Sequence, residues 1–370
     1  MINIEIFEKK FAIYFEGIDT KKFIEELSIY GNLNKKFSAY DYEVFLLRGN
    51  NYDFSEKIIS VNPSSFFFLK DGSFAVDYGH SIIHYQLVRT PKRIIIKVKK
   101  QGFLRKFLSM EYRSNLENLG QIFHELVVVP LMFFDRKKFL IHASAVYDND
   151  SHQVIMFGGT GGVGKTSLEL LLSQSKRYSF FADDICVVDE EGFAYPNLSY
   201  PKIYGYNVLN NKLLTTRDLL KKNTLLSKIH WFLHYYLRGP NKVRRKLCPD
   251  CLFKGGVRKQ KAKIGKYYIL FRTATVKDIC LVEVPVTKVV EPTIQIIKNE
   301  YYTFLRNIRW FVVNSELANK KIDLQGFNIA FSKEILENAL KEAEIYILKI
   351  PLTLSHNEFL NKVRRIIGVE

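Results

Sequence analysis

Residues 159–166 combine glycines, a lysine and a hydroxyl at a spacing that can bind phosphate. They read Gly-Thr-Gly-Gly-Val-Gly-Lys-Thr and match G-x-x-x-x-G-K-[ST], the pattern of a phosphate-binding loop. In such a loop the backbone N–H groups face phosphate oxygens, the lysine reaches the β- and γ-phosphates, and the hydroxyl contacts Mg²⁺. The residues expected at the phosphates are Gly159, Gly161, Gly162, Val163, Gly164, Lys165, Thr166 and Ser167, with Thr166 also on Mg²⁺.

The segments on both sides of this loop are those that the motif needs. Residues 154–157 are apolar and predict a buried strand, and residues 167–172 are good helix formers. The N-terminus of such a helix adds a partial positive charge next to the phosphates. We therefore interpret the loop as a nucleotide site with ATP and Mg²⁺ as cofactors, rather than as a glycine-rich turn that contains a lysine by chance.

A pair of carboxylates, Asp183 and Asp184, follows the loop after about one strand–helix unit. The apolar residues 180–182 come directly before them, so a buried strand should end at this pair. In phosphate-loop enzymes a carboxylate at such a strand end holds Mg²⁺ directly or through water. Two neighbouring carboxylates allow one to bind the metal while the other accepts a proton from an attacking hydroxyl. The alternative is an Asp-Asp turn on the surface.

The composition sets broad limits on function. The chain has 370 residues, of which 47% are hydrophobic and 14% aromatic, enough for two domains or one large domain with a packed core. Its formal net charge of +17 favours an anionic partner, which could be a nucleotide, a nucleic acid, an anionic lipid surface or an acidic peptide. A general abundance of lysine in the source organism would produce the same charge.

Cysteine usage and hydropathy predict a cytoplasmic location. The chain has four cysteines, which are too few for a disulfide scaffold of this size and favour a reducing compartment. The N-terminus lacks the basic and apolar regions of a signal peptide. The apolar stretch at residues 126–134 is too short to span a bilayer, so we expect no membrane span.

Two domains are expected, with a boundary near residue 110. Residues 1–110 contain short apolar runs separated by turn signals such as Asp71-Gly72, which predicts a β-rich antiparallel meander with one helix at residues 19–30. Residues 111–370 begin with an expected helix at 115–135. Strands and helices around the glycine-rich loop then predict an α/β domain.

Residues 209–266 form an expected insertion in this second domain. His230 and His234 lie four residues apart on a predicted helix, and with Cys248 and Cys251 they could form a structural zinc site. The alternative is a helix face and a cysteine pair without metal. The basic runs of this segment could be a solvated surface, a lid over nucleotide phosphates, or a clamp for an acidic peptide or a nucleic acid.

Three of these segments together resemble the HPr kinase/phosphorylase superfamily, in particular its kinase-like members. The segments are 140–144, which contains His-Ala-Ser, the loop at 159–166, and the Ala-Asp-Asp sequence at 182–184. The similarity covers about residues 115–290. It implies an α/β phosphate-loop core of the type found in the C-terminal domain of HPr kinase, preceded here by an unrelated β-rich α+β domain.

The resemblance also implies a reaction, in which the γ-phosphate of a nucleotide passes to a hydroxyl, often of serine. Lys165 would bind the phosphates, and Asp183 would be the catalytic base. Asp184 would bind Mg²⁺ with Thr166, or support the metal ligands. His142 would lie near the γ-phosphate and could donate a hydrogen bond to it, although from the residues alone a packed core histidine is equally consistent.

One segment departs from the family pattern and narrows the expected function. The bifunctional enzymes carry a second metal-binding glutamate in a Leu-Glu-Ile-Arg-Gly segment, whereas residues 200–205 here contain Lys202 and no carboxylate. This difference argues against phosphorylase activity, an HPr partner and a hexamer. We expect a kinase of serine-type hydroxyls on a peptide or protein, such as a biosynthetic precursor peptide. The alternatives are a kinase of free serine or RNA hydroxyls, or a non-catalytic nucleotide-binding module with a basic surface for nucleic acid or another anionic partner.

Overall fold

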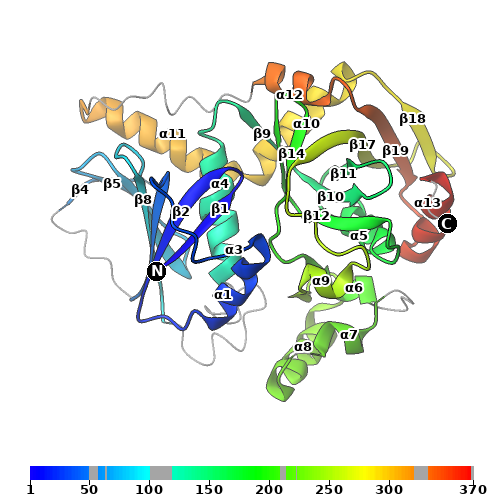
Figure 1. Cartoon of the computed structure of the whole chain (residues 1–370), viewed down its shortest axis with the longest axis horizontal. Coiled ribbons are helices and arrows are strands. Elements are labelled where there is room, and N and C mark those ends of the chain that lie inside the picture. Colours follow the sequence, from blue (N-terminus) through cyan, green and yellow to red (C-terminus); the bar gives the residue numbers. More distant parts are fainter. Residues whose placement is uncertain are drawn as a thin grey trace. The chain divides into compact units, whose positions relative to one another are not determined.

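The computed structural model describes residues 1–49, 57–62, 65–100, 119–208, 214–221, 223–320 and 332–367. It is a mixed α/β structure with three sheets, and the chain divides into two compact units (Figure 1). The first unit comprises Met1–Phe134 and Tyr301–Ala330, and the second comprises Asp135–Glu300 and Phe331–Glu370.

The first unit is built on an eight-stranded sheet in the order β1-β2-β3-β8-β7-β6-β5-β4. Its strands are β1 (Ile2–Ile6), β2 (Lys9–Glu16), β3 (Tyr42–Arg48), β4 (Ile58–Asn62), β5 (Phe66–Leu69), β6 (Phe74–Asp77), β7 (Ser81–Gln86) and β8 (Lys92–Val98). The predicted antiparallel meander is confirmed for β4 to β8. It is wrong for β2, β3 and β8, because β3 pairs in parallel with both neighbours. A helix between β2 and β3 returns the chain to the same end of the sheet, which permits parallel pairing.

Helices from distant parts of the sequence complete the first unit. They are α1 (Lys21–Leu27), η1 (Ser28–Tyr30), α11 (Tyr302–Leu317) and a continuous run of α3 (Leu119–Phe123), η2 (His124–Val128) and α4 (Val129–Met132). Phe123 packs edge-on against Phe11 and Phe23, and Phe311 of α11 packs on Phe74. These aromatic contacts place residues 119–134 and α11 with the first sheet, so the division of the chain differs from the boundary expected near residue 110.

The second unit is built on a nine-stranded sheet with the path β12-β10-β11-β17-β14-β13-β9, to which β19 and β18 add at β17. Its strands are β9 (Lys138–Ile141), β10 (Ala143–Asp148), β11 (Gln153–Gly158), β12 (Tyr178–Ala182), β13 (Cys186–Asp189), β14 (Phe193–Tyr195), β17 (Ala262–Thr273), β18 (Cys280–Glu283) and β19 (Glu344–Pro351). The long strand β17 pairs with β14 at its start and with β19 over the rest, which joins the two parts of the sheet.

Helices and a small ribbon surround this sheet. They are α5 (Lys165–Leu172), α6 (Gly205–Val208), α7 (Thr216–Leu220), α8 (Leu225–Arg238), α9 (Pro249–Leu252), α10 (Thr287–Glu300), α12 (Lys333–Leu340) and α13 (His356–Ile366), with β15 (Lys202–Tyr204) paired to β16 (Arg244–Lys246). The expected insertion at 209–266 thus contributes α7, α8, β16 and α9, and it ends within β17. Of the helices in the described part of the chain, none has the length and apolar character to cross a membrane.

Candidate functional site

The register of three antiparallel strands gathers the predicted site residues at one edge of the second sheet. Ala143 at the start of β10 lies opposite Gly158 at the end of β11, and Ala145 lies opposite Ala182 at the end of β12. Because neighbouring antiparallel strands run in opposite directions, the start of β10 meets the ends of β11 and β12. The His-Ala-Ser segment, the glycine-rich loop and the Asp pair therefore meet, although they are separated in sequence.

The glycine-rich loop connects β11 to α5 and needs glycine at particular positions. Gly159, Gly162 and Gly164 have φ values of 137°, 78° and 119°, which L side chains rarely adopt. A Cβ on Gly159 would lie 2.8 Å from the backbone oxygen of Leu270. Gly161 has an ordinary φ and open space where a Cβ would point. The loop conformation therefore depends on glycine at 159 and tolerates a side chain at 161.

Lys165 folds back over this loop. Its Nζ donates hydrogen bonds to the backbone oxygens of Gly159 and Thr160 at 2.9 and 3.0 Å. The side chain is buried, and this burial lowers the pKa of Lys165 although Asp184 and Asp183 oppose the shift. The ammonium group is thus held within the loop, at the place where the motif expects phosphate oxygens.

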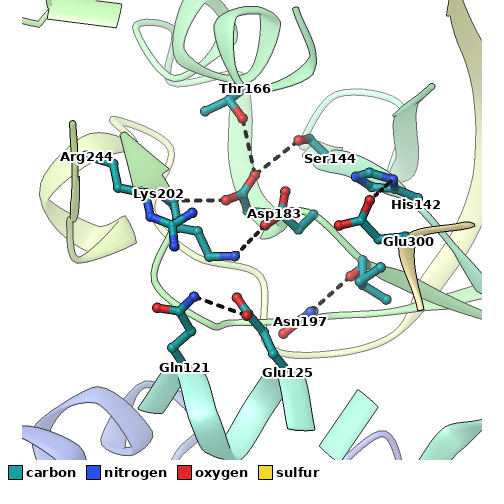
Figure 2. A network of polar contacts seen from close by, with 12 residues as sticks. Gln121, Glu125, His142, Ser144, Thr166, Asp183, Asn197, Lys202, Arg244 and Glu300 are labelled. Atoms are coloured by element: carbon teal, nitrogen blue, oxygen red, sulfur yellow. Dashed lines mark hydrogen bonds and ion pairs between the residues drawn. The ribbon is translucent and has the colours of Figure 1, made fainter. Parts of the chain in front are cut away.

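Asp183 is buried at the end of β12 and connects three segments (Figure 2). Its Oδ1 accepts a hydrogen bond from Ser144 Oγ at 3.2 Å and lies 3.5 Å from Thr166 Oγ1. Its Oδ2 accepts a hydrogen bond from the backbone N–H of Lys202 at 3.2 Å. Burial raises the pKa of Asp183 above its ordinary value, the negative charge of Asp184 adds to the rise, and Lys202 opposes it.

Asp184 differs from its neighbour in exposure and in partner. It is partly exposed, has a φ of 63°, and its Oδ2 lies 2.8 Å from Nζ of Lys202. Burial opposes ionisation, but the charge and hydrogen bond of Lys202 hold the pKa of Asp184 below its ordinary value. The two carboxylates therefore have pKa values shifted in opposite directions. The hydroxyl of Thr166 lies beside Asp183, whereas the sequence predicts that Thr166 binds Mg²⁺ together with Asp184.

His142 lies between β9 and β10, facing the end of α10. Its Nδ1 is 3.5 Å from Oε2 of Glu300, and the side chain is only 5% exposed (Figure 2). Burial lowers the pKa of His142 to about 4, and the nearby charge of Lys165 contributes. The imidazole is therefore neutral at pH 7 and can donate a hydrogen bond from one ring nitrogen only.

Ser167 is the loop residue whose surroundings differ most from its expected phosphate contact. Its side chain is buried, and its Oγ accepts a hydrogen bond from Asn207 Nδ2 of α6 at 3.2 Å. Ser167 thus ties α5 to the segment that follows β15. Val163 is also buried. The other loop residues, Gly159, Gly161, Gly162, Gly164, Lys165 and Thr166, lie between β11 and the first turn of α5.

Ser144 and Glu169 lie at the site although no motif in the sequence assigns either of them a role. Glu169 is four residues after Lys165 on α5, so the two share a helix face, and this spacing was the available signal. Glu169 is 1% exposed, and neither carboxylate oxygen has a hydrogen-bond partner among the described residues. Burial raises the pKa of Glu169 well above its ordinary value, and Asp183 adds to the rise. A buried carboxyl whose ionisation is disfavoured therefore adjoins the Asp pair.

The proposed zinc ligands are not gathered into one site. His230 and His234 are buried on α8 with ring centroids 4.4 Å apart. Cys248 is half-buried and Cys251 exposed, and neither forms a disulfide. Across the described ranges, no group of three or more His, Cys, Asp or Glu side chains is arranged to hold a metal ion. Zinc binding by this set stays a prediction from sequence alone.

Comparisons with known proteins find similarity among solved structures alone. No protein-family profile matches this chain, and no curated protein matches it. Among solved structures, the Hpr(Ser) kinase/phosphatase from Coxiella burnetii aligns with 63% of this chain and 99% of its own, with a TM-score of 0.24 and 9% sequence identity. A similarity of this size does not establish a family.

Proposed function

We propose that this protein is a Mg²⁺- and nucleotide-dependent kinase that moves the γ-phosphoryl group of ATP to a serine-type hydroxyl of a peptide or protein. The observation that carries the proposal is the pair of adjacent carboxyls, Asp183 and Asp184, whose pKa values are shifted in opposite directions beside Lys165 and Thr166. When environments push the pKa values of two such groups apart, one suits proton transfer and the other suits charge stabilisation.

The donor groups present fit a nucleotide with Mg²⁺. Thr166 offers a hydroxyl and Asp184 a carboxylate that stays ionised, and Mg²⁺ prefers oxygen ligands of these kinds. Magnesium usually keeps several waters and takes one or two carboxylates together with substrate phosphates, so a cage of three acidic side chains is not required. When bound, Mg²⁺ would neutralise charge on the phosphates. The N–H groups of the glycine-rich loop and the N-terminus of α5 would face the phosphate oxygens.

Lys165 and His142 would bind and orient the transferring group. The Lys165 ammonium bonds to two loop carbonyl oxygens, and phosphate oxygens would give it stronger, charge-assisted partners. The neutral His142 imidazole would donate a single hydrogen bond to a phosphate oxygen without adding charge. Such positioned donors are the main contribution a protein makes to phosphoryl transfer.

Asp183 would accept the proton of the attacking hydroxyl. Its raised pKa makes it a stronger base than an ordinary aspartate while leaving it largely ionised at pH 7. The backbone N–H of Lys202 and the hydroxyl of Ser144 fix the carboxylate plane. As the hydroxyl oxygen bonds to the γ-phosphorus, its O–H bond breaks, the proton moves to Asp183, and the bond to the ADP leaving oxygen breaks.

The test is nucleotide consumption with Mg²⁺ in the presence of free serine, serine-containing peptides or bulk RNA. The Lys165→Ala variant should lose acceptor-stimulated turnover, by about 100-fold or more. Lys176→Ala, which changes an exposed lysine in the same unit, is the matched control and should retain it. The acceptor that stimulates turnover identifies the substrate class.

Two outcomes would count against the proposal. Tight nucleotide binding without stimulation by any acceptor would favour a non-catalytic nucleotide-binding module. Stimulation by RNA alone, with RNA binding that weakens steeply as salt increases, would keep the chemistry but replace the peptide acceptor by an RNA hydroxyl.

A further inference from the structure

Helix α8 is amphipathic, but it buries its polar side and exposes its apolar side, the reverse of an ordinary surface helix. Its buried face carries Ser227, His230 and His234 together with Trp231. Its exposed face carries seven large apolar side chains, which are between 37 and 80% exposed: Leu225, Leu226, Ile229, Phe232, Leu233, Tyr236 and Leu237. A surface helix normally turns its apolar stripe to the core and its polar residues to water. The polar side of α8 faces the protein and the apolar side faces outward.

The exposed residues form one continuous patch. Their spacing repeats at three, four and seven residues, which places them on the same side of a helix. Single exposed apolar residues are common on protein surfaces, but a contiguous patch of large ones marks an interaction site. Helix α8, which carries all of these residues, lies beside α7 and outside the nine-stranded sheet of the second unit (Figure 1).

The polar side of α8 is fixed to its own unit, so the apolar face has a defined direction. Thr224 caps the helix by accepting a hydrogen bond from the Ser227 N–H, and Ser227 Oγ donates to Asn223 at 2.8 Å. Arg245 of β16 donates to the backbone oxygen of Ser227 at 3.3 Å. The Arg245 contact ties the start of α8 to the β15–β16 ribbon, and the buried side chains of α8 lie opposite its apolar face.

Exposed cations precede and follow α8 in the chain. Arg217, Lys221, Arg238 and Lys242 are exposed on α7, at the end of α8 and just beyond it. Residues 209–266 contain only two carboxylates, Asp218 and Asp250. Asp218 accepts hydrogen bonds from Thr215 in the cap of α7. The segment that carries the patch is therefore strongly positive, which favours a partner that combines negative charge with an apolar interior.

We propose that α8 is an in-plane membrane anchor that inserts its apolar face into the interface of an anionic lipid bilayer. The lysines and arginines before and after α8 in the chain would bind lipid headgroup phosphates. Interfacial helices of this kind combine a bulky apolar face with flanking cations and lie parallel to the membrane. The helix has 14 residues and is about 21 Å long, which is too short to span a bilayer core of about 30 Å.

The shape and charge of the surface favour lipid over a protein partner. A lone helix presents a convex face, whereas amphipathic peptide helices bind in hydrophobic grooves. A fluid bilayer deforms around a convex face and needs no matching cavity. A second copy of this chain would bring two positively charged segments together, which is unfavourable at low ionic strength.

Vesicle co-sedimentation of the full chain tests the proposal. The protein should bind vesicles of phosphatidylcholine with about 30% phosphatidylserine and should bind pure phosphatidylcholine more weakly. The Leu226→Glu/Leu237→Glu double variant should bind the anionic vesicles at least about tenfold more weakly. Leu317→Glu, at an equally exposed position on α11, is the matched control and should change binding by less than about twofold.

A second measurement follows the helix face directly. The Phe232→Trp variant places an indole in the patch, and its emission should shift to the blue when anionic vesicles are added. Unchanged circular dichroism of each variant establishes that the fold is retained. Absence of vesicle binding by the wild type, or equal binding by the double variant, would overturn the proposal. Sedimentation velocity showing a dimer that the same substitutions dissociate would also overturn it, in favour of a second copy.

Discussion

Each of the two units contains a cluster of polar side chains, and the clusters differ in how many of their polar atoms have hydrogen-bond partners. In the first unit, Ser73 Oγ lies 2.6 Å from Nε2 of His84, and Ser73 also hydrogen-bonds to Asp71. In the second unit, Asp183 contacts Ser144, Thr166 and Lys202. Next to it, both oxygens of Glu169 have no partner among the described residues.

The comparison separates a polar cluster that supports the fold from one suited to a ligand. The Asp71–Ser73–His84 cluster alternates donors and acceptors, so each group stabilises the next. The Asp183 cluster places three carboxyls close together and buries Lys165 beside them, an arrangement that raises the free energy of the empty site. A cationic or phosphate-bearing ligand would relieve this cost, and such strain is typical of functional sites.

The largest expected effect on stability concerns the glycine-rich loop, which borders the Asp183 cluster. Gly159→Ala should lower the free energy of unfolding of the second unit by about 3 kcal/mol, because the new Cβ adopts an unfavourable φ and clashes with the Leu270 carbonyl. Gly161→Ala, where the space is open, should change it by less than about 0.5 kcal/mol. Urea unfolding of both variants measures the difference. Equal effects would mean that the loop does not have this conformation.

A second prediction tests the Asp71–Ser73–His84 cluster through the pH dependence of the free energy of unfolding. Burial lowers the pKa of His84 from 6.5 to about 4, although Asp71 opposes the shift. Between these values the unfolded state binds the proton and the folded state does not, so stability falls as pH falls from about 6.5 to 4. We expect His84 to lower the free energy of unfolding by about 2 kcal/mol as the pH falls from 6.5 to 4.5.

The His84→Gln variant isolates this contribution, because glutamine places an amide near Nε2 and does not titrate. Urea unfolding from pH 4.5 to 7.5 gives the free energy of unfolding of wild type and variant at each pH. As the pH falls, the wild type should lose about 2 kcal/mol relative to the variant. At pH 7.5 both side chains are neutral, which provides the internal reference. A constant difference at all pH values would show that His84 is not held neutral in the fold.

The smallest predicted effect concerns the carboxyl without partners. The pKa of Glu169 is raised well above 4.5, so above pH 4.5 the unfolded state loses a proton that the folded state retains, and stability falls as pH rises. Glu169→Gln removes this loss and should stabilise the protein by about 1 kcal/mol at pH 7, with little change near pH 4. Destabilisation at pH 7 would mean that Glu169 is ionised and paired, and the contrast between the clusters would fail.

Local patterns in the sequence predicted much of this structure because they depend on neighbouring residues. The glycine-rich loop lies between a strand and a helix as expected, and the strand before Asp183 is buried. Ser355 and Glu358 form a capping box at the start of α13, a feature set by residues three positions apart. Each of these features is decided within a few residues.

Long-range packing was not predictable in the same way. Nothing in residues 301–320 indicates that α11 packs on the first sheet through Phe311, because that choice depends on a surface formed by residues far away in sequence. The parallel pairing of β3 with β2 and β8 was missed for the same reason. The orientation of α8 was not predicted either. The spacing of its apolar residues predicts an amphipathic helix but does not indicate which face is buried.

The most direct test of the central claim compares wild type with Asp183→Asn in phosphoryl transfer from ATP with Mg²⁺ to a serine-containing peptide. The amide keeps the size of the side chain but cannot accept the hydroxyl proton as a carboxylate does. We predict that transfer falls by at least about 100-fold, while nucleotide affinity measured by calorimetry changes by less than about threefold. Transfer that is unaffected by the substitution, or a wild type that binds nucleotide and transfers nothing to any acceptor, would contradict the account.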